Sequence, residues 1–356
     1  MKNKVIVFRV DASPFIGSGH VMRCLNLAEM FREQQGKVYF LCRDYPRNLS
    51  AEIISRDFEV LLLDFDKKEE YLVQTVSDDY KQWLWVTQDQ DALESMDIIK
   101  KFEISVDLLI LDHYALDSDW EKKCRAITRR ILVIDDLANR LHNCDYLLDQ
   151  NYFSNMADRY LGKVNSDCKL LLGPSYFLFS NSLLYQAKNI RQRTELKRIF
   201  VFFGGADSKD FTSKILPLIK DFPLLEFHIV VGAVNPNFLK IKNSIKDKNC
   251  KLYYNINYMH ELINDCDFGI CAGGVNTYER MLLRLPGIVY ATAENQLETC
   301  NALADNNYIF FCTEFDLDYL RNKLREFSVV DNYQRFILSL NEFPFTNMSV
   351  LSEVAL

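Results

Sequence analysis

The sequence lacks any block of like charges, any fixed-period repeat and any low-complexity tract. Its net charge of −7 and its isoelectric point near 5.4 come from intermixed acidic and basic residues. A mixed surface of this kind argues against nucleic acid or an anionic membrane as the main partner. We therefore expect the protein to act on a small molecule.

The ten cysteines include no Cys-x-x-Cys pair and no zinc-like spacing, which excludes the common structural zinc motifs. They are typical of small buried side chains in a reducing compartment. Long apolar runs are also absent near the N-terminus, where residues 5–10 are too few for a signal sequence or a membrane span. We expect a cytoplasmic protein and a monomer.

A chain of 356 residues exceeds one ordinary hydrophobic core and predicts two domains. Short β-rich runs alternate with helical stretches, as in parallel sheets covered by helices on both faces. The alternation restarts after a polar, basic segment at 186–197. We expect α/β domains at 1–185 and 196–330, a closing helix with a fraying tail at 331–356, and an active-site cleft between the domains. The predicted strands are 5–10, 38–42, 60–63, 108–112, 131–135 and 146–149, followed by 199–203, 227–231, 252–254, 268–271, 287–290 and 308–311.

The loop after the first predicted strand is rich in small, turn-forming and ionisable residues and ends in Gly17-Ser18-Gly19-His20. Its glycines let a ligand approach the main chain, and the free N–H groups of the next helix favour an anion. His20 stands at the start of that helix, where an imidazole could take a proton from water. A structural histidine at a helix start is an equally good interpretation. The third glycine of a dinucleotide fingerprint is missing, which disfavours a Rossmann cofactor site.

Three motifs of the second predicted domain are typical of nucleotide binding. Gly204-Gly205 precedes Asp207, which either caps a helix or contacts a ligand. Gly273-Gly274 precedes a helix whose amides could hold a pyrophosphate, with Glu279 in its first turn as a dipole partner or as an acceptor for ribose hydroxyls. Asn295-Gln296 could donate to phosphate oxygens or cap a helix.

Two predicted strands of the first domain end in polar residues at their carboxyl ends, in Asp112-His113-Tyr114 and Asp135-Asp136. Ligands of open α/β sheets bind at this carboxyl edge.

Taken together, these motifs resemble those of a bacterial UDP-sugar hydrolase family of pseudaminic acid biosynthesis, the UDP-2,4-diacetamido-2,4,6-trideoxy-β-L-altropyranose hydrolases. Matches in the same order run from about residue 5 to residue 310. The first-loop signature is specific, whereas the Gly-Gly and Asn-Gln motifs are shared with related glycosyltransferases. The matching segments are Phe8-Arg9-Val10-Asp11-Ala12-Ser13, Ile16-Gly17-x-Gly19-His20-Val21-x-Arg23-Cys24, Asp112-His113-Tyr114, Asp135-Asp136, Cys144-Asp145, Leu148-Asp149-Gln150-Asn151, Leu171-Leu172-Gly173-Pro174, Gly204-Gly205-x-Asp207, Ala272-Gly273-Gly274 with Glu279, and Asn295-Gln296.

The resemblance implies a GT-B fold, in which two Rossmann-like domains with parallel sheets face a central cleft and the C-terminal one holds the nucleotide. It implies inverting hydrolysis of a UDP-linked diacetamido-trideoxy sugar, with His20 activating the water and with neither metal nor cofactor. Tyr114 would line the sugar or water side, and His113 would be structural. The remaining implied substrate contacts are Asp11, Ser13 and Arg23, which could alternatively fix the loop, together with Gly17, Gly19, Gly205, Gly273, Gly274, Glu279, Asn295 and Gln296.

The chain departs from the family after Gly173-Pro174, where an arginine-bearing segment is common and residues 175–182 contain no basic residue. Two alternatives stay open. A GT-B glycosyltransferase would use an acceptor alcohol in place of water, and a membrane-acceptor enzyme should show a hydrophobic and basic patch, of which the sequence gives no sign. A non-catalytic sugar-nucleotide-binding protein of polysaccharide assembly would be favoured by loss of the base, but His20 is present.

Overall fold

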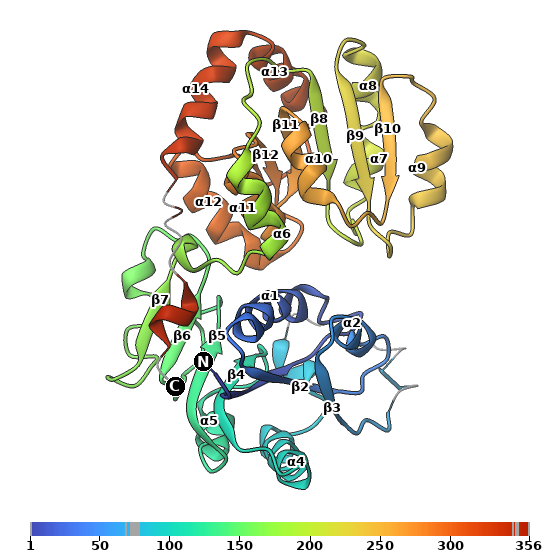
Figure 1. Ribbon diagram of the computed structural model, residues 1–356. Coiled ribbons are helices and arrows are strands. Elements are labelled where there is room, and N and C mark those ends of the chain that lie inside the picture. Colours follow the sequence, from blue (N-terminus) through green and yellow to red (C-terminus); the bar gives the residue numbers. More distant parts are fainter. Residues whose placement is uncertain (1, 68–69, 72–78, 344, 346–348, 355–356) are drawn as a thin grey trace. The chain divides into compact units, whose positions relative to one another are not determined.

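The computed structural model describes residues 2–67, 70–71, 79–343, 345 and 349–354. The chain forms two compact units, each described here by itself (Figure 1). The N-terminal unit comprises Met1–Asn151, Asn155–Leu178 and Thr346–Leu356, and the C-terminal unit comprises Tyr152–Ser154 and Phe179–Phe345.

The N-terminal unit is built on a parallel sheet whose strands follow the order β3-β2-β1-β4-β5-β6-β7. The register pairs Val10, at the end of β1, with Asp112, at the end of β4. The loops after β1, β4 and β5 therefore leave the sheet side by side at one edge. The strands are β1 (Val5–Val10), β2 (Lys37–Arg43), β3 (Glu59–Leu63), β4 (Val106–Asp112), β5 (Thr128–Ile134), β6 (Tyr146–Asp149) and β7 (Lys169–Leu172).

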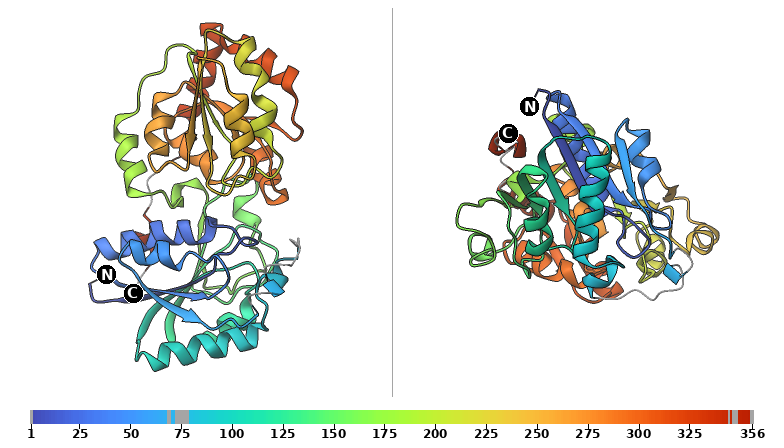
Figure 2. Two further views of the ribbon diagram at one scale, coloured as in Figure 1. Left: turned by 90° about the vertical axis from the view of Figure 1, so that its right-hand side faces the viewer. Right: turned by 90° about the horizontal axis from the view of Figure 1, so that it is seen from below.

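Side chains of the N-terminal sheet alternate between two hydrophobic clusters, one on each face. Ile6, Phe8 and Val10 of β1 join the cluster under α1, whereas Val7 joins the cluster that contains Trp120. Helices cover both faces, as the views of Figure 2 show. The helical elements are α1 (Gly19–Glu33), α2 (Ser50–Ser55), α4 (Gln88–Lys101), α5 (Ser118–Cys124) and α15 (Val350–Glu353), with short 3-10 turns η1 (Tyr80–Trp83), η2 (Met156–Asp158) and η3 (Pro174–Tyr176).

The C-terminal unit repeats this architecture with a parallel sheet in the order β10-β9-β8-β11-β12-β13. The carboxyl ends of β8 and β11 lead into the two Gly-Gly loops, and the two strands are direct neighbours. The strands are β8 (Arg198–Phe202), β9 (Glu226–Val231), β10 (Cys250–Tyr254), β11 (Phe268–Ala272), β12 (Gly287–Tyr290) and β13 (Phe310–Cys312).

Helices surround this second sheet, and a buried arginine ties two of them together. The Arg193 guanidinium donates to the carbonyl oxygens of Ile263 and Asn264 in α10 and of Leu283 after α11. A cation at two helix C-termini offsets the negative ends of both dipoles. The helical elements are α6 (Asn181–Gln186), η4 (Ala187–Asn189), α7 (Phe211–Ile215), α8 (Pro217–Asp221), α9 (Phe238–Ser244), α10 (Met259–Asp265), α11 (Val275–Leu282), η5 (Glu294–Gln296), α12 (Leu297–Asp305), α13 (Leu317–Phe327) and α14 (Val330–Asn341).

The predicted class, two parallel-sheet α/β domains, is confirmed. Two local differences stand out. The sequence analysis missed β7, a four-residue strand at the sheet edge. The tail expected to fray instead contains α15, and Val350 and Val354 are buried in the N-terminal core. A pair of apolar residues four positions apart is too weak a periodic signal to predict that packing.

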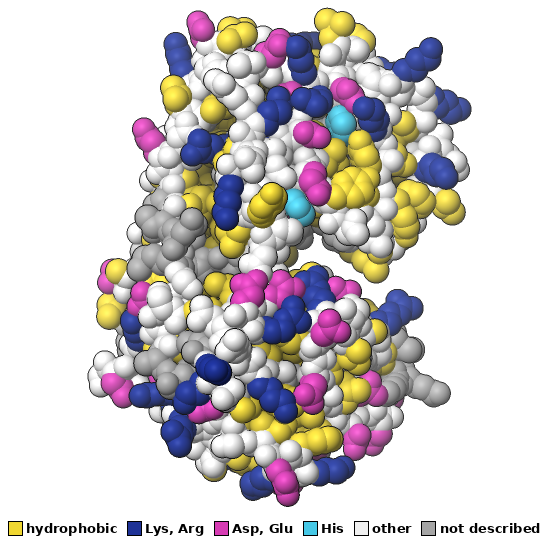
Figure 3. All heavy atoms as spheres, viewed as in Figure 1, with side chains coloured by type: hydrophobic (Ala, Val, Ile, Leu, Met, Phe, Trp, Pro, Cys, Tyr) yellow, Lys and Arg dark blue, Asp and Glu magenta, His cyan; other side chains and the backbone are white. Residues whose placement is uncertain are grey.

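The surface agrees with the mixed charge of the sequence. On the face drawn in Figure 3, basic and acidic side chains are interspersed over each unit. Within the part of the chain that the structure describes, no helix is both long and apolar enough to cross a membrane.

The close contact of β11 with β12 gives a stability prediction. A Cβ at Gly287 would lie 2.4 Å from the Gly269 carbonyl oxygen and 2.6 Å from Nη1 of the buried Arg280. We expect Gly287→Ala to lower the free energy of unfolding by about 1–3 kcal/mol, because the added methyl group would force the neighbouring backbone and the Arg280 side chain out of their packed positions. Urea unfolding measures this change. Gly19→Ala is the control, since a Cβ there meets no atom of the described part of the chain within 4 Å. An equal loss of unfolding free energy in both variants would contradict the prediction.

Candidate active site

His20 lies in the first turn of α1, and its imidazole is held by a buried carboxylate. Its Nδ1 is 2.6 Å from Oδ1 of Asp112, which stands at the end of β4. Arg23 Nη2 also lies 3.3 Å from the same nitrogen. The carboxylate has the shorter contact and can only accept a hydrogen bond, so Nδ1 carries the proton and donates it. Nε2 is then the nitrogen left with a lone pair.

Arg23, one turn further along α1, clamps Asp112 through two hydrogen bonds. Its Nε donates to Oδ2 and its Nη2 to Oδ1, each over 2.6 Å. Burial alone would raise the pKa of Asp112, but the positive charge of Arg23 and the contact with His20 outweigh it and hold the pKa well below its usual range. Asp112 is therefore ionised beside the imidazole.

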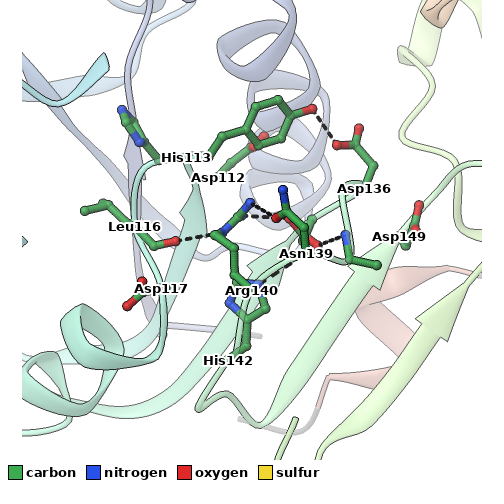
Figure 4. Close-up of polar contacts among 12 residues, drawn as sticks. Asp112, His113, Leu116, Asp117, Asp136, Asn139, Arg140, His142 and Asp149 are labelled. Atoms are coloured by element: carbon green, nitrogen blue, oxygen red, sulfur yellow. Dashed lines mark hydrogen bonds and ion pairs between the residues drawn. The ribbon is translucent and has the colours of Figure 1, made fainter. Parts of the chain in front are cut away.

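A second carboxylate, Asp136, binds both Arg23 and Tyr114. Arg23 Nη1 donates to Asp136 Oδ2 over 3.0 Å, and the Tyr114 hydroxyl donates to Asp136 Oδ1. Figure 4 shows Asp112, Asp136 and Asp149 around the ends of the strands, with the phenol contact of Asp136 dashed. The bond to the carboxylate orients the Tyr114 ring, whose edge-to-face contact with His20 has a centroid distance of 4.5 Å.

Aromatic rings form one wall of the His20 site. Trp83, in η1, stacks on Tyr114 with 5.5 Å between centroids, and it meets the His20 ring edge-on at 6.1 Å. Tyr80, from the same turn, contacts both Trp83 and Tyr114. The imidazole therefore contacts the Asp112 carboxylate through Nδ1 and aromatic rings through its ring edges and face.

Asp11 and Ser13 make their contacts inside the protein, beneath the loop. Asp11 is fully buried and accepts hydrogen bonds from Arg9 and from the Arg43 backbone amide, each over 2.7 Å. The Ser13 hydroxyl accepts from the Tyr71 hydroxyl over 2.5 Å and from two loop amides. These contacts favour the interpretation in which both residues fix the loop. His113 is also buried, and its Nε2 lies 3.3 Å from Asp11 Oδ2, in line with the structural role expected for it.

Gly17 and Gly19 lie on the open side of the same loop. An added Cβ at either position would meet no atom of the described residues within 4 Å. Among the described residues, none blocks the main chain here, beside the start of α1 and His20; that a ligand contacts Gly17 and Gly19 stays a prediction.

In the C-terminal unit, one amide of the Gly273-Gly274 loop cannot bind a pyrophosphate as the sequence analysis predicted. The Gly273 N–H donates to the Tyr290 carbonyl oxygen over 2.8 Å, so it is not available to an anion. Gly274 has a φ of 115°, which glycine alone adopts easily, and this turn starts α11. Among the described residues, none accepts a hydrogen bond from the amides of Gly274, Val275 or Asn276. The predicted pyrophosphate donors are thus shifted one residue along.

Glu279 also lies further along α11 than the sequence analysis placed it. The helix begins at Val275, so Glu279 is in the second turn and not the first. This position weakens its interpretation as a dipole partner, because that effect fades beyond the first turn. The carboxylate is half-buried and accepts a hydrogen bond from Asn276 Nδ2 over 3.1 Å. Burial raises the pKa of Glu279, and the bond from Asn276 partly opposes that shift.

Gln296 lies directly against the Gly273 turn. A Cβ on Gly273 would be 2.9 Å from Gln296 Oε1, which accepts from the Thr292 amide over 2.9 Å. Asn295 is exposed. Gly205 lies on the neighbouring loop, where Asp207 accepts from the Phe211 and Thr212 amides and thereby caps α7. The capping interpretation of Asp207 is the one that the geometry supports.

The structure thus gathers the candidate residues into two groups, one in each unit. His20, Arg23 and Tyr114 meet in the first group, and Gly273, Gly274 and Gln296 meet in the second. Sequence reasoning assigned no role to Asp112 or Asp136, although both follow strands at the ligand edge. It also missed Trp83 and Tyr80, which come from a short turn without a recognisable motif. Among the described residues, no three His, Cys, Asp or Glu side chains are arranged to hold a metal ion.

Comparison with solved structures defines the fold class. MurG of Acinetobacter baumannii has a TM-score of 0.62 at 12% identity, over 96% of this chain and 95% of that one. UGT89C1 of Arabidopsis thaliana has a TM-score of 0.65 at 12% identity, over 96% and 94%. UGT2 of Phytolacca americana, solved with UDP-2-fluoro-glucose and pterostilbene, has a TM-score of 0.68 at 11% identity, over 95% and 93%. The fold is therefore that of GT-B glycosyltransferases.

Sequence comparison gives a more particular likeness. The chain is 27% identical over 305 residues to the UDP-2,4-diacetamido-2,4,6-trideoxy-β-L-altropyranose hydrolase of Campylobacter jejuni, covering 85% of this chain and 97% of that protein. It is 24% identical to the spore coat polysaccharide biosynthesis protein SpsG of Bacillus subtilis, covering 81% and 78%. No model of a known protein family matches. The resemblance drawn from the motifs is confirmed, and it supports an enzymatic role.

Asp149, at the end of β6, gives a prediction about stability and pH. Burial, and then the nearby charge of Asp136, raise its pKa to about 8. In the unfolded chain an aspartate ionises near pH 4, so between about pH 4 and pH 8 the folded state binds the extra proton and stability falls as the pH rises. We expect the free energy of unfolding, measured in urea, to fall between pH 5 and pH 8 by at least about 1 kcal/mol more in the wild type than in Asp149→Asn.

The matched control for this experiment is Asp145→Asn. The pKa of Asp145 is lowered by contacts to the Ile131 amide, Arg125 and Arg130, which outweigh its burial, so it stays ionised across this range. The free energy of unfolding of Asp145→Asn should fall between pH 5 and pH 8 by the same amount as that of the wild type. Equal losses in wild type and Asp149→Asn would show that Asp149 does not take up a proton on folding.

Proposed function

We propose that this protein hydrolyses UDP-2,4-diacetamido-2,4,6-trideoxy-β-L-altrose to UDP and the free 2,4-diacetamido-2,4,6-trideoxy-L-altrose, a step of pseudaminic acid biosynthesis. The observation that carries the proposal is the ionised Asp112 on Nδ1 of His20, in a chain similar along most of its length to a hydrolase of that substrate. A histidine held in this way is suited to act as a general base.

In the proposed reaction, Nε2 of His20 takes a proton from water as the water oxygen bonds to the anomeric carbon. The bond between that carbon and the β-phosphate oxygen breaks, and its electron pair leaves with UDP. Asp112 keeps the proton of His20 on Nδ1 and stabilises the imidazolium that forms. One direct displacement inverts the configuration at the anomeric carbon.

The leaving group explains why one base is enough. UDP departs as a phosphate, which needs charge stabilisation and no strong general acid. The amides of Gly274, Val275 and Asn276 at the start of α11 are suited to that role, with the positive end of the helix dipole behind them. Glu279 would accept the ribose hydroxyls, since an ionised carboxylate only accepts. In this scheme neither the deprotonation of water nor the departure of UDP requires a metal ion.

The proposal needs one substrate to reach residues of both units, because His20 and the α11 loop belong to different ones. That the two groups meet across a central cleft stays a prediction. The roles of Asn295 and Gly205 as substrate contacts also stay predictions.

The first experiment measures UDP release from the diacetamido-trideoxy sugar nucleotide by purified protein in the presence of a chelator. We expect release by the wild type, a loss of at least about 100-fold in His20→Ala, and no release from UDP-GlcNAc. His260→Ala is the matched control, because it removes a partly exposed histidine of α10 in the C-terminal unit and should keep full activity.

The outcomes separate the alternatives. If the wild type binds UDP but releases none from this substrate, the hydrolase proposal fails, and an acceptor-dependent transferase or a non-catalytic binding protein takes its place. If His20→Ala releases UDP as fast as the wild type, the proposed hydrolase activity holds but His20 is not its general base.

The nucleotide half of the site has its own test in calorimetric titration with UDP. We expect Glu279→Gln to weaken UDP binding by about tenfold or more, since hydrogen bonds to a charged group contribute about 1.5–3 kcal/mol. Glu294→Gln removes an exposed carboxylate from η5 and should bind UDP as the wild type does. Unchanged affinity in Glu279→Gln would exclude Glu279 as the ribose ligand.

A further inference from the structure

We infer that Asp136 is a positioning residue that controls both the geometry and the protonation of His20. The inference rests on the proposed function for its link to activity. It concerns a carboxylate that does not touch His20 and that acts through two neighbours which do.

The first route from Asp136 to His20 runs through Arg23. This guanidinium binds Asp112 with Nε and Nη2, and its remaining nitrogen, Nη1, donates to Asp136 over 3.0 Å. A planar guanidinium bound at three nitrogens has its orientation fixed. Asp136 therefore sets the position of the group that clamps Asp112, and Asp112 in turn holds the imidazole.

The second route runs through Tyr114. Its hydroxyl donates to Asp136 Oδ1, and its ring packs on the His20 ring at a centroid distance of 4.5 Å. Burial, and then the negative charge of Asp136, raise the pKa of Tyr114, so the phenol stays protonated and keeps donating. One carboxylate thus fixes two side chains that contact the imidazole, Arg23 and Tyr114.

Charge balance gives Asp136 a second effect. Asp112, Arg23, Asp136 and His20 together carry one net negative charge when His20 is neutral, and none when His20 is protonated. Their side chains are at least four-fifths buried, so an unbalanced charge is costly there. Asp136 supplies the negative charge that balances the imidazolium formed during the reaction.

Several other charged and titratable groups face the pair. The Arg140 guanidinium lies 5.7 Å from the centroid of the Tyr114 ring, and burial together with nearby carboxylates, Asp136 among them, raises the pKa of Tyr160. Tyr80 reaches the site from η1, and Cys24 donates to Asp112 from α1. Asp149 lies near Asp136, whose backbone carbonyl accepts from Arg159. Among the described residues, none of these groups supplies a second carboxylate bonded to Arg23 and Tyr114. Asp149, whose pKa the Asp136 charge helps to raise, ionises more readily when that charge is removed, so it offsets part of the lost charge without restoring either contact. The charged and titratable groups around His20 and Asp136 include Asp112, Arg23, Cys24, Tyr80, Tyr114, Arg140, Asp149, Arg159 and Tyr160.

The test compares Asp136→Asn with wild type in the pH profile of kcat/KM. We expect kcat/KM at neutral pH to fall about tenfold or more, and the acidic limb to move to lower pH by about half a unit or more. The direction follows because loss of a nearby negative charge disfavours the imidazolium. Asp145→Asn, which removes a partly buried carboxylate bonded to Arg125 and Arg130, should leave the profile unchanged.

Asp136→Glu distinguishes the effect of the negative charge from the effect of the carboxylate position. It also provides the test if Asp136→Asn does not fold. The glutamate keeps the charge but displaces the carboxylate by one methylene. We expect the acidic limb to stay at the wild-type position while kcat falls. A purely structural role for Asp136 would lower the amount of folded protein without moving the limb in either variant.

A second readout does not depend on the substrate. NMR titration of histidine-labelled protein, with the His20 signal assigned by His20→Ala, should give a lower midpoint in Asp136→Asn than in wild type. If the wild type hydrolyses nothing but this midpoint moves, the proposed function fails and the positioning role stands. If the wild type is active and neither the midpoint nor the acidic limb moves, the inference about Asp136 is overturned.

Discussion

The buried carboxylate of Asp112 is the constraint on which the candidate site depends. It accepts from His20 and twice from Arg23, each over 2.6 Å. An ion of this kind is stable inside a protein only when its charge is balanced and its oxygens are hydrogen-bonded. That requirement fixes the imidazole tautomer, and it also joins α1 to the end of β4. The same bonds therefore serve folding and chemistry.

The two units hold charge in different ways. The N-terminal unit uses side-chain ions, with Arg9, Asp11, Arg43 and Asp91 fully buried under the loop that carries His20. The second Gly-Gly loop of the C-terminal unit offers backbone amides and a helix dipole at the start of α11. Side-chain ions suit a base whose proton affinity must be set, whereas fixed amides suit a phosphate that arrives already charged.

Much of the fold could be read from the sequence because its signals are local. The apolar runs of β1, β6 and β12 matched the observed bounds, since each is short and β-rich; polar residues border β1 and β6, and Pro286 precedes β12. The edge strand β7 and the tail helix α15 were missed, because their burial depends on elements far away in the chain. Glu279 was placed one turn too early for a related reason, since helix starts are the least precise part of such predictions.

The sequence by itself determined the alternating α/β pattern, the glycine loops and His20 as the candidate base, because each is a short stretch with its own chemistry. Only the tertiary structure decided which groups surround that base. His20, Asp112 and Asp136 are far apart in the chain, and the strand order β1-β4-β5 brings their loops to one edge of the sheet. Neighbouring parallel strands end together, so residues near three separate strand ends become one network, and no local pattern records which of them will meet.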